Sequence, residues 1–585
     1  MRYEQPIHEA FTRLGFTPRD HQAERVDRVV SAFLDDKAKN VVLSAPTGTG
    51  KSIIGTVVGE VLHSIRYPDT KANATFLLSA TNVLLDQYFQ TFGDRAENGF
   101  LLLKGAGNYE CKALSTPEEP QTAEACAIPI FRKTGAQDLI DLYCGGCEYQ
   151  VSRARKAGAR HIITNYAFYF IDRMYSTTPM PRRTLTVFDE AHLLNDLFVE
   201  HNAIYVSEKR LNQFAEEVNE HLTLGHTDVF RNLKAVREAL VRGKISDEDG
   251  SYLKWLQVLL DTYTAISEAA KQAAERSIRQ PAKFIKLQRL SKKFYNLGCK
   301  IDDLFLFEYP HVFEHKPRDV KKGQAEDELS VKPIFVGDMF EALDNAEHNL
   351  LMSATVSEAY AKRTMTLPGD TIGIRLEPSF PRESKRMVFF KPQALNYSSM
   401  KQPETVKKLC ATAWQIVDHH VKQGHRGIVL APSFAVVESV AATLRGMSPS
   451  YRIFEHLRGE KLADVLADFK AYTAGPAVML TPSGFEGIDL PGDLSRFQVI
   501  VKAPFASLGD KRIKVILDRY PDIYSLTTLM KIVQGAGRSV RSSEDHAVTY
   551  ALDTGIQRLW TGKDNVWANE FQTSYTSNLN STDAD

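Results

Sequence analysis

The sequence predicts an α/β protein with two parallel sheets, and three observations support this. Short β-branched runs recur in both halves, helical patterns lie between them, and 585 residues are too many for one hydrophobic core. We therefore expect two units, residues 1–385 and 390–565. Two segments do not follow the alternation and are expected as insertions in the first unit.

The predicted strands are apolar runs that end in turn residues. They lie at 41–43, 75–78, 162–163, 185–188 and 350–352, and then at 427–430, 477–480 and 497–501. The first insertion, 105–160, is loop-rich and contains four cysteines. The second, 197–335, favours long helices, as between Tyr252 and Arg279. Residues 566–585 are expected to be a polar tail, disordered from Gln572 onward.

The composition is typical of a soluble globular protein, with 43% apolar and 25% charged residues. Basic and acidic residues number 72 each, so the chain has no net positive charge. A nucleic-acid partner would therefore have to bind to a local patch of basic side chains. The N-terminus has no apolar signal segment, and no apolar run approaches the length of a membrane span. Six cysteines in a chain of this length favour a reducing compartment, so we expect a cytoplasmic protein.

A phosphate-binding loop follows the first predicted strand, at Ala45-Pro-Thr-Gly-Thr-Gly-Lys-Ser52. Glycines allow backbone N–H groups to turn toward phosphate oxygens at the start of a helix. Lys51 would reach the β- and γ-phosphates, and the Ser52 hydroxyl would ligate Mg²⁺. The predicted ATP-binding residues of the loop are Thr47, Gly48, Thr49, Gly50, Lys51 and Ser52.

A carboxylate pair follows another predicted strand, in the tetrapeptide Asp189-Glu-Ala-His192. Adjacent residues at a strand end point in different directions, so the two carboxylates can have different roles. Asp189 suits the outer sphere of Mg²⁺, and Glu190 suits activation of the attacking water. Alone such a tetrapeptide is often a solvated helix start, but after a phosphate loop it indicates a DEAH box.

Together these motifs resemble those of superfamily-two helicases, which commonly carry alanine at the position of Ala45. The resemblance extends from about residue 17 to residue 560. It implies two RecA-like domains and a set of further site residues. These are Arg19, Gln22 and Asp489 for ATP; His192, Ser353 and Thr355 for coupling; Thr81, Asn165, Tyr166, Ser433 and Ser483 for DNA; and Gln534, Arg538 and Arg541 for catalysis.

The two arginines have a direct physical role in this resemblance. Negative charge spreads over the γ-phosphoryl group in the transition state, and a planar guanidinium can stabilise it. Arg538 and Arg541 of Gln534-Gly-Ala-Gly-Arg-Ser-Val-Arg541 are the candidates. The alternative is that they form a surface salt bridge.

Four cysteines lie within one short segment, with the spacing C-x14-C-x17-C-x2-C: Cys111, Cys126, Cys144 and Cys147. In a reducing compartment this pattern indicates a metal site, and the spacing by itself leaves zinc and iron–sulfur open. The flanking residues 105–111 and 147–166 resemble those around the cluster of DinG and XPD helicases. The resemblance implies a [4Fe–4S] cluster. Zinc and four unliganded thiols are the alternatives, and redox sensing is an alternative to a wedge that separates the strands.

The resemblance implies that residues 197–335 form an arch over the DNA strand. Basic residues alternate with aromatic ones there and could follow phosphates, although such a pattern is more often a solvated helix face: Lys283, Phe284, Lys286, Arg289, Lys292, Lys293, Phe294 and Tyr295.

We therefore expect a bacterial or phage enzyme of the DinG type, an ATP- and Mg²⁺-dependent DNA helicase. It would act as a monomer on single-stranded and forked or tailed duplex DNA, in replication, repair or recombination at the nucleoid. Movement 5′→3′ is implied by the family only. About twenty residues precede Gln22, too few for the nuclease domain that some DinG proteins carry. A translocase that does not unwind, or an RNA helicase, is the alternative.

Overall fold

The fold is that of a computed structural model of the whole chain. It describes residues 1–19, 21–46, 48–93, 99–112, 115, 120–126, 128, 138, 140–141, 144–176, 178–222, 227–241, 245–319, 324, 326–447, 449–485, 488–540 and 544–579.

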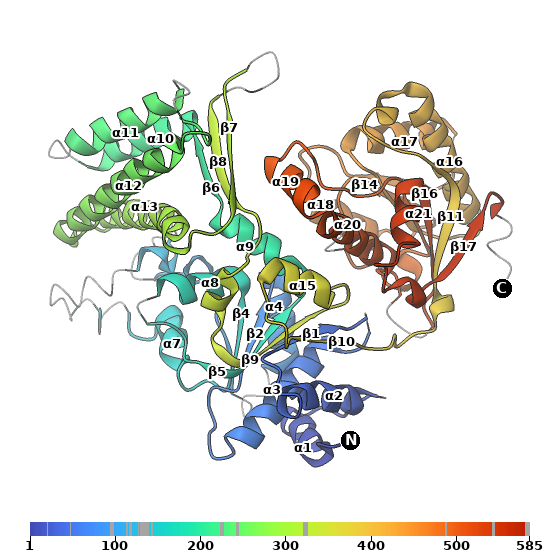
Figure 1. The fold of residues 1–585 in the computed structure, drawn as a ribbon, viewed down its shortest axis with the longest axis horizontal. Coiled ribbons are helices and arrows are strands. Elements are labelled where there is room, and N and C mark those ends of the chain that lie inside the picture. Colours follow the sequence, from blue (N-terminus) through green and yellow to red (C-terminus); the bar gives the residue numbers. More distant parts are fainter. Residues whose placement is uncertain are drawn as a thin grey trace. The chain divides into compact units, whose positions relative to one another are not determined.

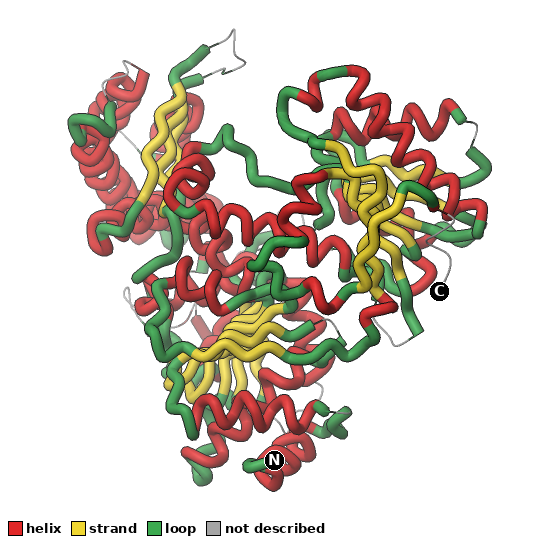
Figure 2. Tube along the Cα trace, turned by 45° about the vertical axis from the view of Figure 1, so that its right-hand side comes forward, coloured by secondary structure: helices red, strands yellow, loops and turns green. Residues whose placement is uncertain are grey.

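The chain divides into two compact units. The first comprises Met1–Val42, Ser52–Leu351 and Ala361–Ile372, and the second comprises Leu43–Lys51, Met352–Tyr360 and Gly373–Asp585. Each contains one seven-stranded sheet for the most part, and Figure 2 shows each sheet as a band of adjacent strands with helices on its faces.

The first sheet has the strand order β10-β1-β9-β5-β2-β4-β3. Its strands are β1 (Asn40–Ser44), β2 (Thr75–Ser79), β3 (Phe100–Leu102), β4 (His161–Asn165), β5 (Arg183–Asp189), β9 (Ala346–Ser353) and β10 (Ile372–Arg375). All residues of β1, β2 and β5 are buried, as in a sheet covered on both faces. The five strands expected in this half are therefore confirmed, while β3 and β10 are additional.

Helices connect and cover these strands (Figure 1). They are α1 (Glu4–Leu14), α2 (Gln22–Leu34), α3 (Lys51–Arg66), α4 (Asn82–Phe92), α7 (Glu148–Arg155), α8 (Tyr166–Tyr175), α9 (Leu194–Asn202), α14 (Met339–Leu343) and α15 (Glu358–Met365). Within the described part of the chain, no helix is both long and apolar enough to cross a bilayer.

Residues 204–333 form a separate arrangement within the first unit. A three-stranded antiparallel sheet has the order β6-β8-β7, and α12 packs along α13. The elements are β6 (Ile204–Ser207), α10 (Glu208–His221), α11 (Thr227–Val241), α12 (Ser251–Arg276), α13 (Pro281–Phe307), β7 (His311–Lys316) and β8 (Glu328–Pro333). The long helices were expected, whereas the small sheet that closes the segment was not.

The second sheet has the order β13-β14-β12-β15-β16-β11-β17, and all of these neighbouring strands pair in parallel. Its strands are β11 (Lys385–Gln393), β12 (Gly427–Leu430), β13 (Arg452–Glu455), β14 (Ala477–Thr481), β15 (Phe497–Ile500), β16 (Ala547–Asp553) and β17 (Gln572–Thr576). Its helices are α16 (Pro403–Lys422), α17 (Phe434–Gly446), α18 (Leu462–Ala471), α19 (Lys511–Arg519), α20 (Pro521–Ala536) and α21 (Thr554–Trp560).

Two boundary predictions in this half were wrong. The sheet begins at Lys385 rather than near residue 390, because β11 pairs with β16 from that residue. The expected tail contains β17, which pairs in parallel with β11 at the edge of the sheet. Its residues are polar because they are only partly covered, and the Tyr575 ring stacks on Phe389 at 5.0 Å between centroids. Residues 580–585 lie outside the described part.

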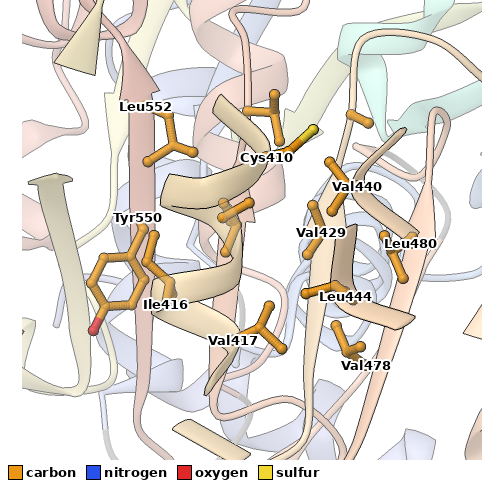
Figure 3. Close-up of a cluster of buried hydrophobic side chains, with 14 of the residues drawn as sticks. Cys410, Ile416, Val417, Val429, Val440, Leu444, Val478, Leu480, Tyr550 and Leu552 are labelled. Carbon is orange, nitrogen blue, oxygen red and sulfur yellow. The ribbon is translucent and has the colours of Figure 1, made fainter. Parts of the chain in front are cut away.

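One continuous core holds the second sheet to α16 and α17 (Figure 3). Ile416 and Val417 of α16, Val440 of α17 and Val429 of β12 are all fully buried. Cys410 is 3% exposed in the same core, where it packs as a small hydrophobic residue. Cys299 is only half-buried.

A buried ionic cluster fixes α3, the helix that follows the phosphate loop, against β4. The Glu60 carboxylate is 1% exposed and accepts hydrogen bonds from Arg160 (Nη2–Oε2 2.8 Å) and from His161 (Nε2–Oε1 2.6 Å). Arg13 Nη1 lies 2.8 Å from Oε2. Burial alone would raise the pKa of Glu60, but the hydrogen bonds from His161 and Arg160 outweigh it and hold that pKa far below its usual range.

Glu60→Gln is expected to destabilise the first unit by about 3 kcal/mol, because it leaves buried cationic groups without their partner. A carboxylate with a lowered pKa contributes its stability above its unfolded pKa and loses it as pH falls. The deficit should therefore be equal at pH 7.5 and 5.5 and shrink only below about pH 4.3. Calorimetric unfolding checks this, with the exposed Glu24→Gln as the control. An equal melting temperature for Glu60→Gln and wild type would contradict it.

Candidate functional site

The phosphate loop has the geometry that its sequence predicts. β1 ends at Ser44, Ala45 N donates to Ser353 O at 2.9 Å, and α3 begins at Lys51. Gly48 and Gly50 have φ of 84° and 76°. The loop is therefore wound in the left-handed conformation that favours glycine and that turns N–H groups inward.

Two threonines of the loop were predicted to bind ATP. Thr49 is 1% exposed, and its Oγ1 donates to Pro46 O at 2.8 Å, so its side chain holds the loop together. Thr47 lies outside the described residues.

Gly48→Ala is expected to weaken ATP binding by about tenfold or more, because a side chain is strained at φ 84°. Its Cβ would also lie 2.3 Å from Cζ of Phe380. Nucleotide affinity can be measured with a fluorescent ATP analogue. Gly446→Ala is the matched control, since its Cβ would meet nothing within 4 Å. Equal affinities for wild type and Gly48→Ala would contradict the loop assignment.

The DEAH box begins at the end of β5. Asp189 is 6% exposed, its Oδ1 accepts from Glu190 N at 3.0 Å, and its Oδ2 accepts from the Tyr88 hydroxyl at 2.7 Å. Glu190 has φ 53°, a left-handed conformation that a non-glycine residue rarely adopts. His192 Nδ1 lies 3.3 Å from Glu190 Oε2. The strained turn separates the two carboxylates, so one can serve the metal and the other the water.

The loop and the DEAH box lie at the same edge of the first sheet. β9 runs parallel to β1, because Asn349 N donates to Lys39 O and Ala45 N donates to Ser353 O. β9 and β5 also begin together, since Arg183 N donates to Asn345 O. Ligand sites of parallel sheets lie beyond the carboxyl ends of the strands. Hydroxyl and carboxylate oxygens such as those of Ser52 and Asp189 are the ligands that Mg²⁺ prefers.

The segment predicted to recognise adenine precedes α2. Gln22 is the first residue of that helix and is 2% exposed. Its amide oxygen accepts from Arg19 N at 2.9 Å. The contact fixes the side chain of Gln22 at the helix start, and the Arg19 side chain is exposed.

The predicted coupling residues lie at the end of β9. Ser353 is fully buried, and its Oγ accepts from Thr355 N at 3.2 Å. Thr355 Oγ1 accepts from Gln534 Nε2 at 3.0 Å, a contact within the second unit. The sequence motifs at 353–355 and at 534–541 are thus linked by a direct hydrogen bond.

The Arg538 side chain is buried against backbone carbonyl groups of the second unit. It is 4% exposed, and its guanidinium donates to Ile488 O at 3.0 Å and to Gly535 O at 3.3 Å. The alternative of a surface salt bridge is therefore wrong for Arg538. Arg541 lies outside the described residues.

Four of the predicted DNA contacts lie at loop or helix starts. Thr81 caps α4 and Ser433 caps α17, each accepting from a backbone N–H of its helix. Asn165 caps α8, and its Nδ2 donates to Asn82 Oδ1 at 2.7 Å. Ser483 is exposed in the loop after β14, as is the predicted ATP contact Asp489 farther along.

Tyr166, which was predicted to contact DNA, is buried in this structure. Tyr166 is 1% exposed, its ring stacks on Phe188, and its hydroxyl donates to Asp189 O at 2.7 Å. The residue that sequence analysis missed is Tyr88, which contacts Asp189 from α4. In the sequence Tyr88 follows directly after Leu85-Asp86-Gln87, and nothing there distinguishes it from an ordinary aromatic residue of a helix.

The four cysteines of the first insertion lie near one another. Burial, together with the neighbouring thiols of Cys126, Cys111 and Cys147, raises the pKa of Cys144 to about 11. Gln150 Nε2 donates to Cys126 Sγ at 3.2 Å. Among the described residues, however, no three His, Cys, Asp or Glu side chains are arranged to hold a metal ion.

The basic residues of α13 contact other protein groups. Lys293 pairs with Glu217, Lys286 lies 3.6 Å from Glu220, and Arg289 donates to Gln121. Phe284 and Phe294 are buried and cannot stack on bases. These contacts favour the alternative of an ordinary helix face.

Comparisons with known proteins agree with this architecture. Residues 15–227 match the family described as type III restriction enzyme, res subunit, and residues 416–564 match the helicase C-terminal domain. The ATP-dependent DNA helicase YoaA of Escherichia coli (strain K12) is 22% identical over 93% of this chain and 92% of its own length. Its Haemophilus influenzae counterpart is 21% identical over the same shares.

Two solved structures share the fold at 16% identity. "XPD_Helicase" has a TM-score of 0.61 and covers 96% of this chain and 100% of its own. "Structure of S. tokodaii Xpd4" has a TM-score of 0.56 and covers 95% and 100%. The two family matches and the YoaA relatives support a helicase of superfamily two that is similar to the DinG and XPD helicases, and the solved structures show that the fold is shared.

Proposed function

We propose that this chain is an ATP-dependent DNA helicase that moves 5′→3′ along single-stranded DNA and separates forked or tailed duplexes. The observation that carries the proposal is the pairing of a left-handed phosphate loop with a strained DEAH turn at one edge of a parallel sheet. The relatives' names supply the DNA substrate, and the family supplies the direction.

The residues divide the chemistry of ATP hydrolysis among them. Lys51 would hold the β- and γ-phosphates, while Ser52 and Asp189 would hold Mg²⁺. Glu190 would accept the proton of the attacking water. Arg538, whose guanidinium donates to Ile488 O and Gly535 O, would stabilise the negative charge that develops on the γ-phosphoryl group.

We further propose that Cys111, Cys126, Cys144 and Cys147 hold a [4Fe–4S] cluster. The thiols are neighbours in a segment with little regular structure among its described residues, and the Gln150 amide already donates to one sulfur, a contact that tunes such clusters. The cluster would cross-link residues 105–160 into a rigid wedge that separates the strands. Residues 197–335 would then be the arch. We also propose that the protein acts as a monomer at the nucleoid, in DNA replication, repair or recombination.

A strand-displacement assay tests the activity. Duplexes with a 5′ tail, with a 3′ tail, and with RNA strands are compared at equal enzyme concentration. Unwinding of the 5′-tailed DNA alone is the expected result. ATP hydrolysis that DNA stimulates without any unwinding would leave a translocase, and preference for RNA would leave the RNA helicase.

Cys144→Ser tests the cluster. Wild-type protein is expected to be brown and to contain about four iron atoms and four sulfides per chain. The variant should lose the iron, the visible absorbance and the unwinding, while Cys299→Ser, outside the four, should retain all three. Zinc instead of iron would identify the alternative metal, and full unwinding by colourless Cys144→Ser would overturn the wedge.

A further inference from the structure

Two buried tyrosines bond to one residue of the DEAH box. The Tyr88 hydroxyl donates to Asp189 Oδ2, and the Tyr166 hydroxyl donates to Asp189 O, each at 2.7 Å. Tyr88 is 6% exposed and Tyr166 1%. One tyrosine thus fixes the carboxylate of Asp189 and the other fixes its backbone.

The side chain of Ser52, the other predicted Mg²⁺ ligand, lies next to the Tyr88 hydroxyl. If Ser52 donates to Tyr88 and Tyr88 donates to Asp189, each hydroxyl proton is engaged in a hydrogen bond to another side chain. Lone pairs on the Ser52 and Asp189 oxygens then remain for the metal.

Both tyrosines belong to helices that begin at predicted DNA contacts. α4 is capped by Thr81, and Tyr88 follows seven residues later, about 10 Å along the helix axis. Tyr166 is the first residue of α8, directly after its cap Asn165. Asn165 Nδ2 donates to Asn82 Oδ1 at 2.7 Å, which ties the two helix starts together.

A helix two turns long moves as a rigid body, so a strand that shifts the start of α4 or α8 also shifts the tyrosine hydroxyl. We propose that Tyr88, together with Tyr166, is a positioning residue that couples single-stranded DNA at the starts of α4 and α8 to the orientation of the Mg²⁺ ligands Ser52 and Asp189. The inference rests on the proposed function, because it takes DNA as the ligand of that surface.

Tyr88→Phe keeps the ring and removes only the hydroxyl. The Mg²⁺ concentration that gives half-maximal ATP hydrolysis is expected to rise about tenfold, as when the partner of a metal ligand is removed. Stimulation of hydrolysis by a single-stranded oligonucleotide is expected to fall about fivefold or more. Affinity for the oligonucleotide without nucleotide should stay within about twofold of wild type, since the surface itself is unchanged. Tyr166→Phe should lower the stimulation with a smaller effect on Mg²⁺.

Tyr169→Phe is the matched control. Tyr169 is fully buried in α8 and donates to Leu343 O at 2.7 Å, so the variant loses the same kind of bond away from the DEAH box. Neither the half-saturating Mg²⁺ concentration nor the stimulation ratio depends on the folded fraction. A purely structural role for Tyr88 therefore predicts wild-type values of both, and that result overturns the proposal.

The proposed function can fail separately. If the oligonucleotide does not stimulate hydrolysis by wild type, the function and the coupling are both overturned. Mg²⁺-dependent binding of a fluorescent ATP analogue then still decides whether Tyr88 orients the metal ligands: an unchanged Mg²⁺ requirement in Tyr88→Phe overturns that role too.

Discussion

Replacing Lys51 with alanine is expected to lower the rate of ATP hydrolysis by about 10³-fold, the effect of removing a donor aimed at developing charge. Lys51 begins α3 directly after the left-handed glycines, where its ammonium group can meet the phosphates. The measurement is steady-state phosphate release with saturating single-stranded DNA. ATP binding should weaken as well, because the lysine contacts the ground state and the transition state.

Lys71→Ala is the control for charge and length. Its side chain is exposed outside the site, so turnover should equal that of wild type. Turnover by Lys51→Ala within about tenfold of wild type would overturn the assignment of the phosphate loop, since one transition-state contact is worth more than that.

Glu190→Gln is expected to lower the rate of ATP hydrolysis by a similar factor, but for a different physical reason. Loss of the general base should lower turnover by about 10³-fold, while ATP and Mg²⁺ still bind because Lys51, Ser52 and Asp189 remain. Single-turnover measurements should show ATP held on the enzyme without cleavage. The neighbouring His192 Nδ1 loses its charged partner at 3.3 Å, which is a small electrostatic change.

Two results distinguish this role from a structural one. Glu268→Gln, an exposed change on α12, should leave turnover unaffected. A Glu190→Gln protein that fails to bind nucleotide would indicate that the left-handed turn at φ 53° has collapsed, and rapid turnover would assign the base to another residue.

Most strands that were predicted from the sequence are almost fully buried, although β11 and β16, which are also largely buried, were not predicted. A strand covered on both faces needs an unbroken apolar run, so residues 185–188 and 477–480 stand out in the sequence. β17 and β13 were missed because they lie at the edges of the second sheet, where polar residues are tolerated. The sheet β6-β8-β7 was missed because two of its strands are distant in sequence and only partly buried.

The sequence by itself determined the nucleotide chemistry of this protein. The motifs for this chemistry are short, and local backbone geometry fixes the residues in them: Gly48, Gly50, Lys51 and the Asp189-Glu190 pair. Tertiary structure decided the contacts that join distant segments. Only the packing of α4 and α8 on the first sheet brings Tyr88 and Tyr166 to Asp189, from which they are separated by about a hundred and about twenty residues of sequence. From the sequence alone, a tyrosine in a helix is predicted to be a core residue. Only the folded structure shows which group accepts the hydrogen bond from its hydroxyl.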